Sequence, residues 1–96
     1  MKIYLKKFGT TLISRQAGNE SFRAIQPTLS DLKDSDNLEV DFEGVVTFSP
    51  SWGDEFLTPL RQRYQERLIL LHTENPSVQA TLDLLEKINK KPFRRL

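Results

Sequence analysis

The sequence predicts a single α/β domain over residues 1–96, with a small mixed sheet of about four strands and helices packed on it. Three observations carry this prediction. Apolar and polar residues alternate from Leu38 to Phe42, as in a strand with one buried face. Apolar residues between Trp52 and Tyr64 recur at helical spacing, and residues 68–71 form a continuous apolar run typical of a buried strand. The predicted order is β-β-α-β-α-β-α, in which intervening helices indicate parallel neighbours joined by right-handed crossovers.

The amino-terminal residues predict two short strands. Ile3 and Leu5 fall on one face of the first strand, because alternate residues of a strand share a face. Leu12-Ile13 gives the second strand, and Phe8-Gly9-Thr10 offers a turn between the two. We therefore expect a β-hairpin, although its turn lacks the Asn-Gly sequence that most strongly favours one.

A helical pattern follows Ser14. One apolar stripe is formed by Phe22, Ile25, Leu29 and Leu32. Pro27 lies off this stripe, and it must kink the helix or begin a second one because proline has no amide hydrogen and crowds the preceding turn. Gly18 weakens the first turns, so we expect the helix to begin nearer Asn19.

Several polar residues gather around the next strand end. Asp41 and Glu43 lie at the carboxyl end of the strand at 38–42, where open α/β sheets usually place their sites. Gly44 permits a positive φ there. A further extended stretch at 45–48 ends at Ser49-Pro50-Ser51, which opens the helix. Asp54 and Glu55 are expected in the first turn of this helix, where negative charge complements the helix dipole.

Asn75-Pro76 predicts the start of the last helix, because asparagine caps helices and proline fits their first position. The predicted core stripe of this helix consists of Val78, Leu82, Leu85 and Ile88. On its solvent side we expect two ion pairs, Asp83 with Lys87 and Glu86 with Lys90. Residues 92–96 predict no element.

Composition restricts the class of protein. The chain is 38% hydrophobic and 28% charged, with a formal net charge of +1, so it has no overall field that would attract nucleic acid or an anionic membrane. It has no cysteine, which excludes disulfides and thiolate chemistry. The longest apolar run is too short to span a bilayer, and lysines interrupt any signal-peptide core at the amino terminus. A cytoplasmic protein is the expectation.

The candidate functional residues each have a structural alternative. Ser49 and Ser51 are helix caps or phospho-acceptors. Trp52 is an anchor of the helix stripe or an interface hot spot. As a metal pair, Asp41 and Glu43 lack further ligands, so solvation or pairing with arginine is favoured. His72, the only histidine, is expected to be an ordinary side chain at a strand end.

The chain resembles the STAS-like domains of unknown function in two stretches, Val40–Val45 (VDFEGV) and Phe48–Phe56 (FSPSWGDEF). The resemblance extends more loosely from Ile13-Ser14-Arg15 to the last helix. The wider STAS fold includes the bacterial anti-sigma-factor antagonists, which bind a kinase-like partner and are switched by phosphorylation of a serine at a helix start. Membership therefore implies a regulatory signalling domain with a protein partner and no cofactor. A histidine-kinase-type ATPase is the leading partner, because genes of the family often accompany one.

The sequence departs from the antagonist pattern at the phosphorylated serine. Antagonists typically read Asp-Ser-Ser-Gly, and aligned on Phe48 this stretch is Ser49-Pro50-Ser51-Trp52, so Pro50 occupies the acceptor position. Ser49 or Ser51 could serve instead. A helix start stabilises phosphate, whereas Asp54 and Glu55 would repel it.

Three functional hypotheses follow, and the last of them, a catalytic or small-ligand domain, has no motif that supports it. The first is a non-catalytic interaction domain that binds a protein partner through the region Ser49–Phe56, with Asp41, Glu43, Trp52, Asp54 and Glu55 as contact candidates. The alternative is a nucleic-acid-associated protein that uses the basic residues Lys87, Lys90, Lys91, Arg94 and Arg95. No glycine-rich phosphate loop, metal-ligand cluster or nucleophile-base pair has diagnostic spacing, so the sequence predicts neither an enzyme nor a cofactor or metal site.

Overall fold

Four short parallel strands form the main sheet of the computed structural model, which describes all 96 residues. Their order in the sheet is β1 (Lys2–Tyr4), β3 (Leu38–Asp41), β5 (Leu68–Leu70) and β6 (Arg94–Arg95). A second, two-stranded parallel sheet pairs β2 (Thr11–Leu12) with β4 (Thr47–Phe48). The helices are α1 (Arg15–Ala24), α2 (Gln26–Leu29), α3 (Pro50–Tyr64) and α4 (Pro76–Asn89), with 3₁₀ turns η1 (Leu5–Phe8) and η2 (Gln65–Arg67). The predicted α/β class is confirmed.

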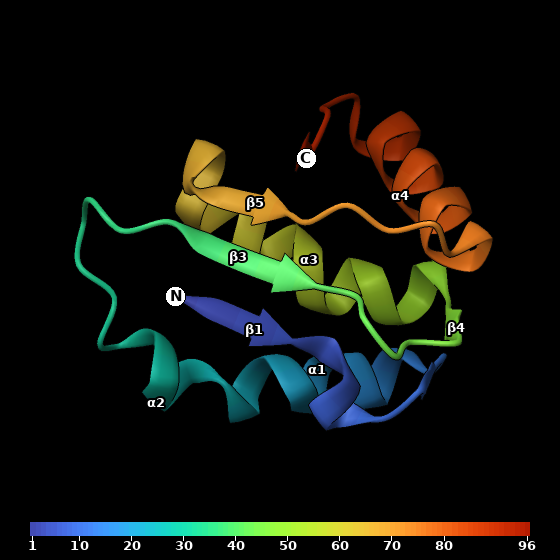
Figure 1. Cartoon of the computed structure of the whole chain (residues 1–96), viewed down its shortest axis with the longest axis horizontal. Coiled ribbons are helices and arrows are strands. Elements are labelled where there is room, and N and C mark those ends of the chain that lie inside the picture. Colours follow the sequence, from blue (N-terminus) through green and yellow to red (C-terminus); the bar gives the residue numbers. More distant parts are fainter.

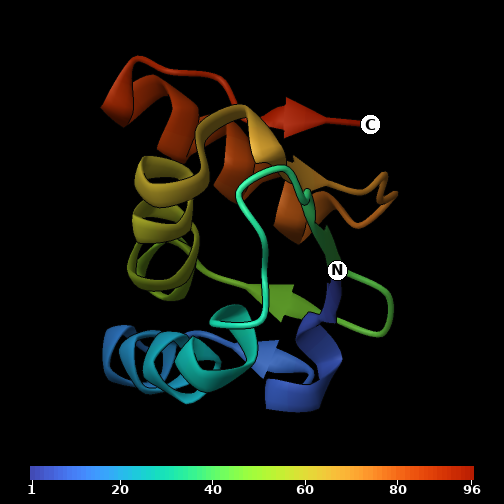
Figure 2. The ribbon, with the colours of Figure 1, turned by 90° about the vertical axis from the view of Figure 1, so that its left-hand side faces the viewer.

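The helices lie on one face of the main sheet (Figures 1 and 2). In register across the sheet, Ile3, Val40 and Leu70 are neighbours, and all three are buried. The alternate row begins with Lys2 and Glu39, which are at least partly exposed. One face of the sheet therefore packs against the helices, as the alternation at 38–42 predicts. The other face carries polar side chains at β1 and β3, but at β5 it holds Ile69, which is buried beside Arg94.

Each of the three longer helices begins at a side-chain cap. The Ser14 hydroxyl accepts a hydrogen bond from the Ala17 amide at α1, and the Asn75 carboxamide accepts two at α4. The Asn75 side chain also donates to the carbonyls of Val45 and Val46, which ties the start of α4 to the segment before β4. Capping thus fixes where these helices start. At Asn75 it also fixes the segment 45–46 beside the start of α4.

The predicted amino-terminal hairpin is wrong. β1 pairs in parallel with β3, and β2 pairs in parallel with β4 in the other sheet. Between them the chain winds through η1, which buries Leu5 in the core, and turns at Gly9 with a φ of 126°. Non-local pairing wins because it places Ile3 beside the buried Val40. Every strand pairing is parallel, so the sheet is not mixed.

Helix α1 begins at Arg15, four residues before the predicted start near Asn19. The early start is possible because the Ser14 cap offsets the poor helix propensity of Gly18. Gly18 is also required there: a Cβ atom at this position would lie 2.7 Å from the backbone oxygen of Trp52 on α3. Of the two alternatives for Pro27, the second holds, since a separate short helix, α2, begins at Gln26.

The last helix and the tail differ from the sequence prediction in three ways. Ile88 is 63% exposed and does not join the core stripe. Asp83 and Glu86 pair with Arg95 rather than with lysines one turn away on their own helix. Arg95 lies in β6, a strand that the sequence did not predict. It forms because residues 94–95 hydrogen-bond alongside β5, as only the folded sheet allows.

The core is centred on a cluster of aromatic rings at the start of α3. Trp52 is 1% exposed and stacks on Phe56, with ring centroids 4.7 Å apart and planes 23° apart. Phe48 and Phe8 pack against the same indole at centroid distances of 5.6 and 6.2 Å. The sequence placed Trp52 correctly on the apolar stripe of this helix.

We expect Gly18→Ala to destabilise the protein by about 1–3 kcal/mol, because the added methyl group has no space against the α3 backbone. Helix propensity alone predicts that the same substitution stabilises the protein, because alanine favours a helix more than glycine does. Urea denaturation measures the effect. Asn19→Ala is the matched control, since it gains helix propensity next to the same contact and should change stability by no more than about 0.5 kcal/mol. A Gly18→Ala variant as stable as wild type would disprove the close contact.

Candidate functional site

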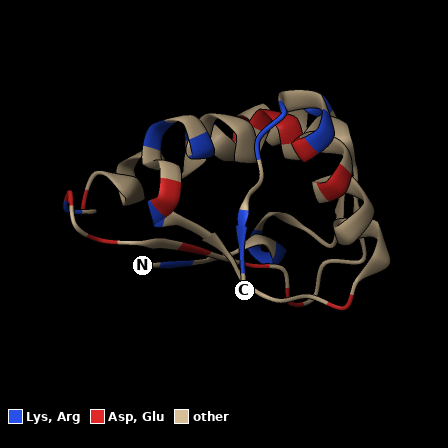
Figure 3. Ribbon diagram, turned by 90° about the horizontal axis from the view of Figure 1, so that it is seen from above, with Lys and Arg blue, Asp and Glu red and all other residues tan.

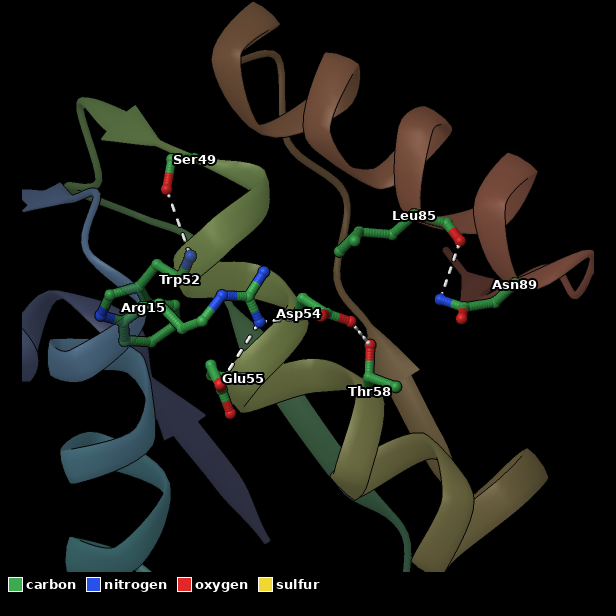
Figure 4. Close-up of polar contacts among 8 residues, drawn as sticks. All are labelled: Arg15, Ser49, Trp52, Asp54, Glu55, Thr58, Leu85 and Asn89. Carbon is green, nitrogen blue, oxygen red and sulfur yellow. Dashed lines mark hydrogen bonds and ion pairs between the residues drawn. The ribbon is translucent and has the colours of Figure 1, made fainter.

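Ser49 lies between β4 and α3 and acts as the cap of α3. Its hydroxyl accepts a hydrogen bond from the Trp52 amide at 3.2 Å (Figure 4) and donates one to the carbonyl of Ile13 at 2.7 Å. The same side chain therefore starts the helix and attaches it to the segment that precedes α1. Both hydrogen-bonding roles of this hydroxyl are structural.

Arg15 connects α1 to α3. Its Nη1 atom lies 3.1 Å from Asp54 Oδ2 and 3.3 Å from Glu55 Oε1 (Figure 4). The Thr58 hydroxyl donates to the other oxygen of Asp54 at 2.8 Å, which holds that carboxylate in place. The hydrogen bonds that Arg15 donates to Asp54 and Glu55 raise the pKa of Arg15 above its ordinary value. These two carboxylates are thus already partnered within the chain.

A shallow hollow of about 100 Å³ lies beside the start of α3. We call it the Ser51 hollow, and its lining residues are Arg15, Pro50, Ser51, Asp54, Leu85 and Ile88. It brings together side chains from α1, α3 and α4. The Ser51 hydroxyl makes no hydrogen bond within the chain, in contrast to the Ser49 hydroxyl. Ser51 is therefore the serine whose side chain is free to react or to bind.

Two sequence expectations about α3 require correction. Asp54 and Glu55 do not lie in the first turn of the helix, which contains no acidic residue, but in the second. They therefore do not complement the free amides at the helix start. Moreover, Arg15 places positive charge beside them, so they oppose a phosphate at Ser51 less than the sequence alone implies.

The other predicted contact residues lie apart from this hollow. Asp41 ends β3, and its Oδ1 atom accepts the backbone amide of Glu43 at 2.9 Å, which stabilises the turn that Gly44 completes with a φ of 83°. Glu43 faces Lys6 at 4.0 Å. Trp52 is buried in the core and offers no surface to a partner. The structure therefore brings Ser51 and Asp54 together in the hollow, with Glu55 linked to it through Arg15. Asp41, Glu43 and Trp52 do not take part.

The basic residues of the alternative nucleic-acid hypothesis differ in how far nearby carboxylates compensate their charge. Arg95 forms ion pairs with Asp83 at 2.9 Å and with Glu86 at 3.0 Å, which offsets its charge. Lys91 donates to Gln65 at 2.7 Å. The predicted basic tail is thus partly neutralised by α4. His72 is exposed and lies 2.6 Å from the Glu74 carboxylate.

No group of three or more His, Cys, Asp or Glu side chains is placed to hold a metal ion. The chain contains no helix with the length and apolar character needed to cross a bilayer. Searches against protein-family models, curated proteins and solved structures found no match to this chain.

Sequence reasoning missed Arg15, Leu85 and Ile88 as members of the hollow. Arg15 meets carboxylates that follow it by 39 and 40 residues, and no local spacing predicts such a pair. Leu85 and Ile88 were assigned to the core stripe together, and only packing separates the buried one from the exposed one.

We expect Ser49→Ala to lower the free energy of unfolding by about 0.5–2 kcal/mol, because it removes the cap of α3. Ser51→Ala, two residues away in the same turn, should change it by less than about 0.5 kcal/mol, because its hydroxyl has no partner to lose. Chemical denaturation of the two variants compares them directly. Equal losses would contradict the assignment of the cap to Ser49.

Proposed function

We propose that this chain is a non-catalytic regulatory domain that binds a protein partner through the surface around the Ser51 hollow. The observation that carries the proposal is the mixed character of that surface. Ile88 is an exposed apolar side chain, and it lies beside the polar groups of Arg15, Ser51 and Asp54 in one hollow. Protein interfaces commonly combine an apolar centre with polar groups at its rim.

Leu84 extends this surface along α4. It is 41% exposed and lies one turn before Ile88, so the two side chains share a face of the helix. The start of α3, which carries part of this surface, is held rigidly. Ser49 caps the helix, and Trp52 packs in the core against Phe48 and Phe56. A rigid surface binds with a smaller ordering cost than a mobile one.

The partner class comes from the resemblance to STAS-like domains. On that ground a histidine-kinase-type ATPase in the cytoplasm is the leading partner. The nucleic-acid alternative receives less support, because Arg95 is paired with two carboxylates and the net charge is only +1. We therefore do not propose it.

Ile88→Lys should weaken partner binding without unfolding the protein, because Ile88 contributes little to the core and a lysine would place charge in the apolar part of the interface. Cross-linking in the native cell followed by mass spectrometry identifies the proteins bound to wild type and to the variant. Each identified partner is then purified, and its affinity is measured by calorimetry. We expect at least about a tenfold loss of affinity for Ile88→Lys.

Val46→Lys is the matched control, because Val46 is 65% exposed, apolar and outside the Ser51 hollow. Its binding should remain within about twofold of wild type. Equal recovery of every partner with both variants would rule out this surface. A specific partner without an ATPase domain would retain the interaction function and reject the kinase-type partner.

If phosphorylation controls this interaction, Ser51 is the expected acceptor, since its hydroxyl is free and Arg15 lies across the same hollow to pair with phosphate. The intact mass of protein recovered from its native cell should then show one phosphate, and Ser51→Ala should remove it. Phosphate retained in Ser51→Ala but lost in Ser49→Ala would assign the modification to the cap instead.

A further inference from the structure

A second and larger hollow lies at the opposite end of α3. Its volume is about 420 Å³, within the range of about 300–1,000 Å³ typical of small-ligand sites. We call it the Arg61 hollow. The residues that matter to its chemistry are Arg61, Glu66, Lys91, Phe93 and Arg94. It is formed where the end of α3, the start of β5 and the tail segment meet.

Arg61 is an unusual residue because it is a buried cation without a carboxylate partner. Only 5% of it is exposed, and no Asp or Glu oxygen lies within 4.0 Å of it, so it forms no salt bridge. Its Nη1 atom donates one hydrogen bond, of 2.7 Å, to the carbonyl of Lys91, and its guanidinium lies 4.3 Å from the ring centroid of Phe93. Burial lowers the pKa of Arg61, with the charges of Glu86 and Asp54 partly opposing this effect.

The nitrogens of Arg61 that make no hydrogen bond within the chain are not fully enclosed. A guanidinium has five N–H groups, and only one hydrogen bond from Arg61 is made to the protein. No buried side-chain nitrogen or oxygen in this chain lacks a hydrogen-bond partner, so the unpaired nitrogens of Arg61 must retain contact with solvent. Arg61 is one of the residues that line the hollow, so the hollow is the opening in which these nitrogens can meet solvent or a ligand.

Two further cations stand at the rim. Lys91 is held by Gln65 at 2.7 Å, and Arg94 is held by the carbonyl of Glu66 at 3.0 Å. Both side chains are therefore positioned by groups that leave their charge uncompensated. Three cations and one carboxylate, that of Glu66, give the hollow a formal charge of +2. In Figure 3 the tail between α4 and the carboxyl terminus carries blue segments.

The geometry points to a binding site for a small phosphate monoester in the Arg61 hollow. A phosphate monoester carries a charge of about −1.5 to −2 at neutral pH, which matches the charge of the hollow. The guanidinium of Arg61 would bind its oxygens through the free donors, with Lys91 and Arg94 closing over it. This function is separate from partner binding, because the Ser51 hollow shares no residue with it.

A small molecule fits better than a nucleic acid strand. The cation that defines the site is almost fully buried, whereas a phosphodiester backbone is held by exposed side chains along a track. Arg95, which would continue such a track, is paired with Asp83 and Glu86. The volume exceeds that of phosphate alone, and Leu68 and Phe93 supply apolar contact for the rest of the molecule.

The test is an NMR titration of the full chain with inorganic phosphate at constant ionic strength, followed at the Arg61 Nε–H group and the Phe93 amide. Phenyl phosphate and glucose 6-phosphate form separate arms that report whether the rest of the ligand is aromatic or polar. We expect saturable shifts with a dissociation constant below about 1 mM for at least one monoester. Sodium chloride at the same ionic strength should give none.

Arg94→Gln should weaken this binding about tenfold, since it removes one charge-assisted contact from an exposed position. Arg61→Lys should do the same while preserving charge, because it loses the planar fork. Lys7→Gln is the control: it removes one charge beside Phe8, at the other end of α3, and should leave affinity within about twofold.

Three results would overturn the inference. Shifts that fail to saturate, or that chloride reproduces, would mean that no phosphate site exists. Unchanged affinity in Arg94→Gln, with native stability, would place the binding elsewhere. A single-stranded oligonucleotide that displaces the monoesters at far lower concentration would assign the hollow to nucleic acid.

Discussion

The close approach of α1 to α3 at Gly18 and Trp52 is the contact on which the rest of this structure depends. A side chain at Gly18 would collide with the α3 backbone, so the two helices can pack at this distance only with glycine there. That distance lets Phe8 and Phe56 enclose the Trp52 indole. It also brings Arg15, one turn before Gly18, within reach of the carboxylates that follow Trp52.

Helix α3 separates the two hollows, and each derives its chemistry from its own end of the helix. At the start, the Ser49 cap uses its hydroxyl fully and leaves Ser51 free. At the end, Arg61 is buried under the tail, where a positive charge near the carboxyl end of a helix is favourable. About ten residues of helix, roughly 15 Å, lie between Ser51 and Arg61, so the two hollows are spatially separate.

Charges in this protein are paired mainly over long sequence distances, and this is where sequence reasoning was weakest. Local rules predicted ion pairs within α4, yet Asp83 and Glu86 bind Arg95 from a strand that forms only beside β5. Arginine presents a planar fork of donors that matches a carboxylate, whereas exposed lysine–carboxylate pairs four residues apart contribute little to stability. The same tail position creates the hollow around Arg61, so missing one feature meant missing the other.

The sequence by itself determined the α/β class, the starts of α3 and α4, the buried strand at 68–70 and the core position of Trp52. These features depend on local periodicity and capping, which the order of residues specifies directly. Tertiary structure alone decided that β1 pairs with β3 and β2 with β4. It also decided the position of Ile88 outside the core and the members of both hollows. Those outcomes depend on which distant segments meet, and close packing settles that only when the whole chain has folded.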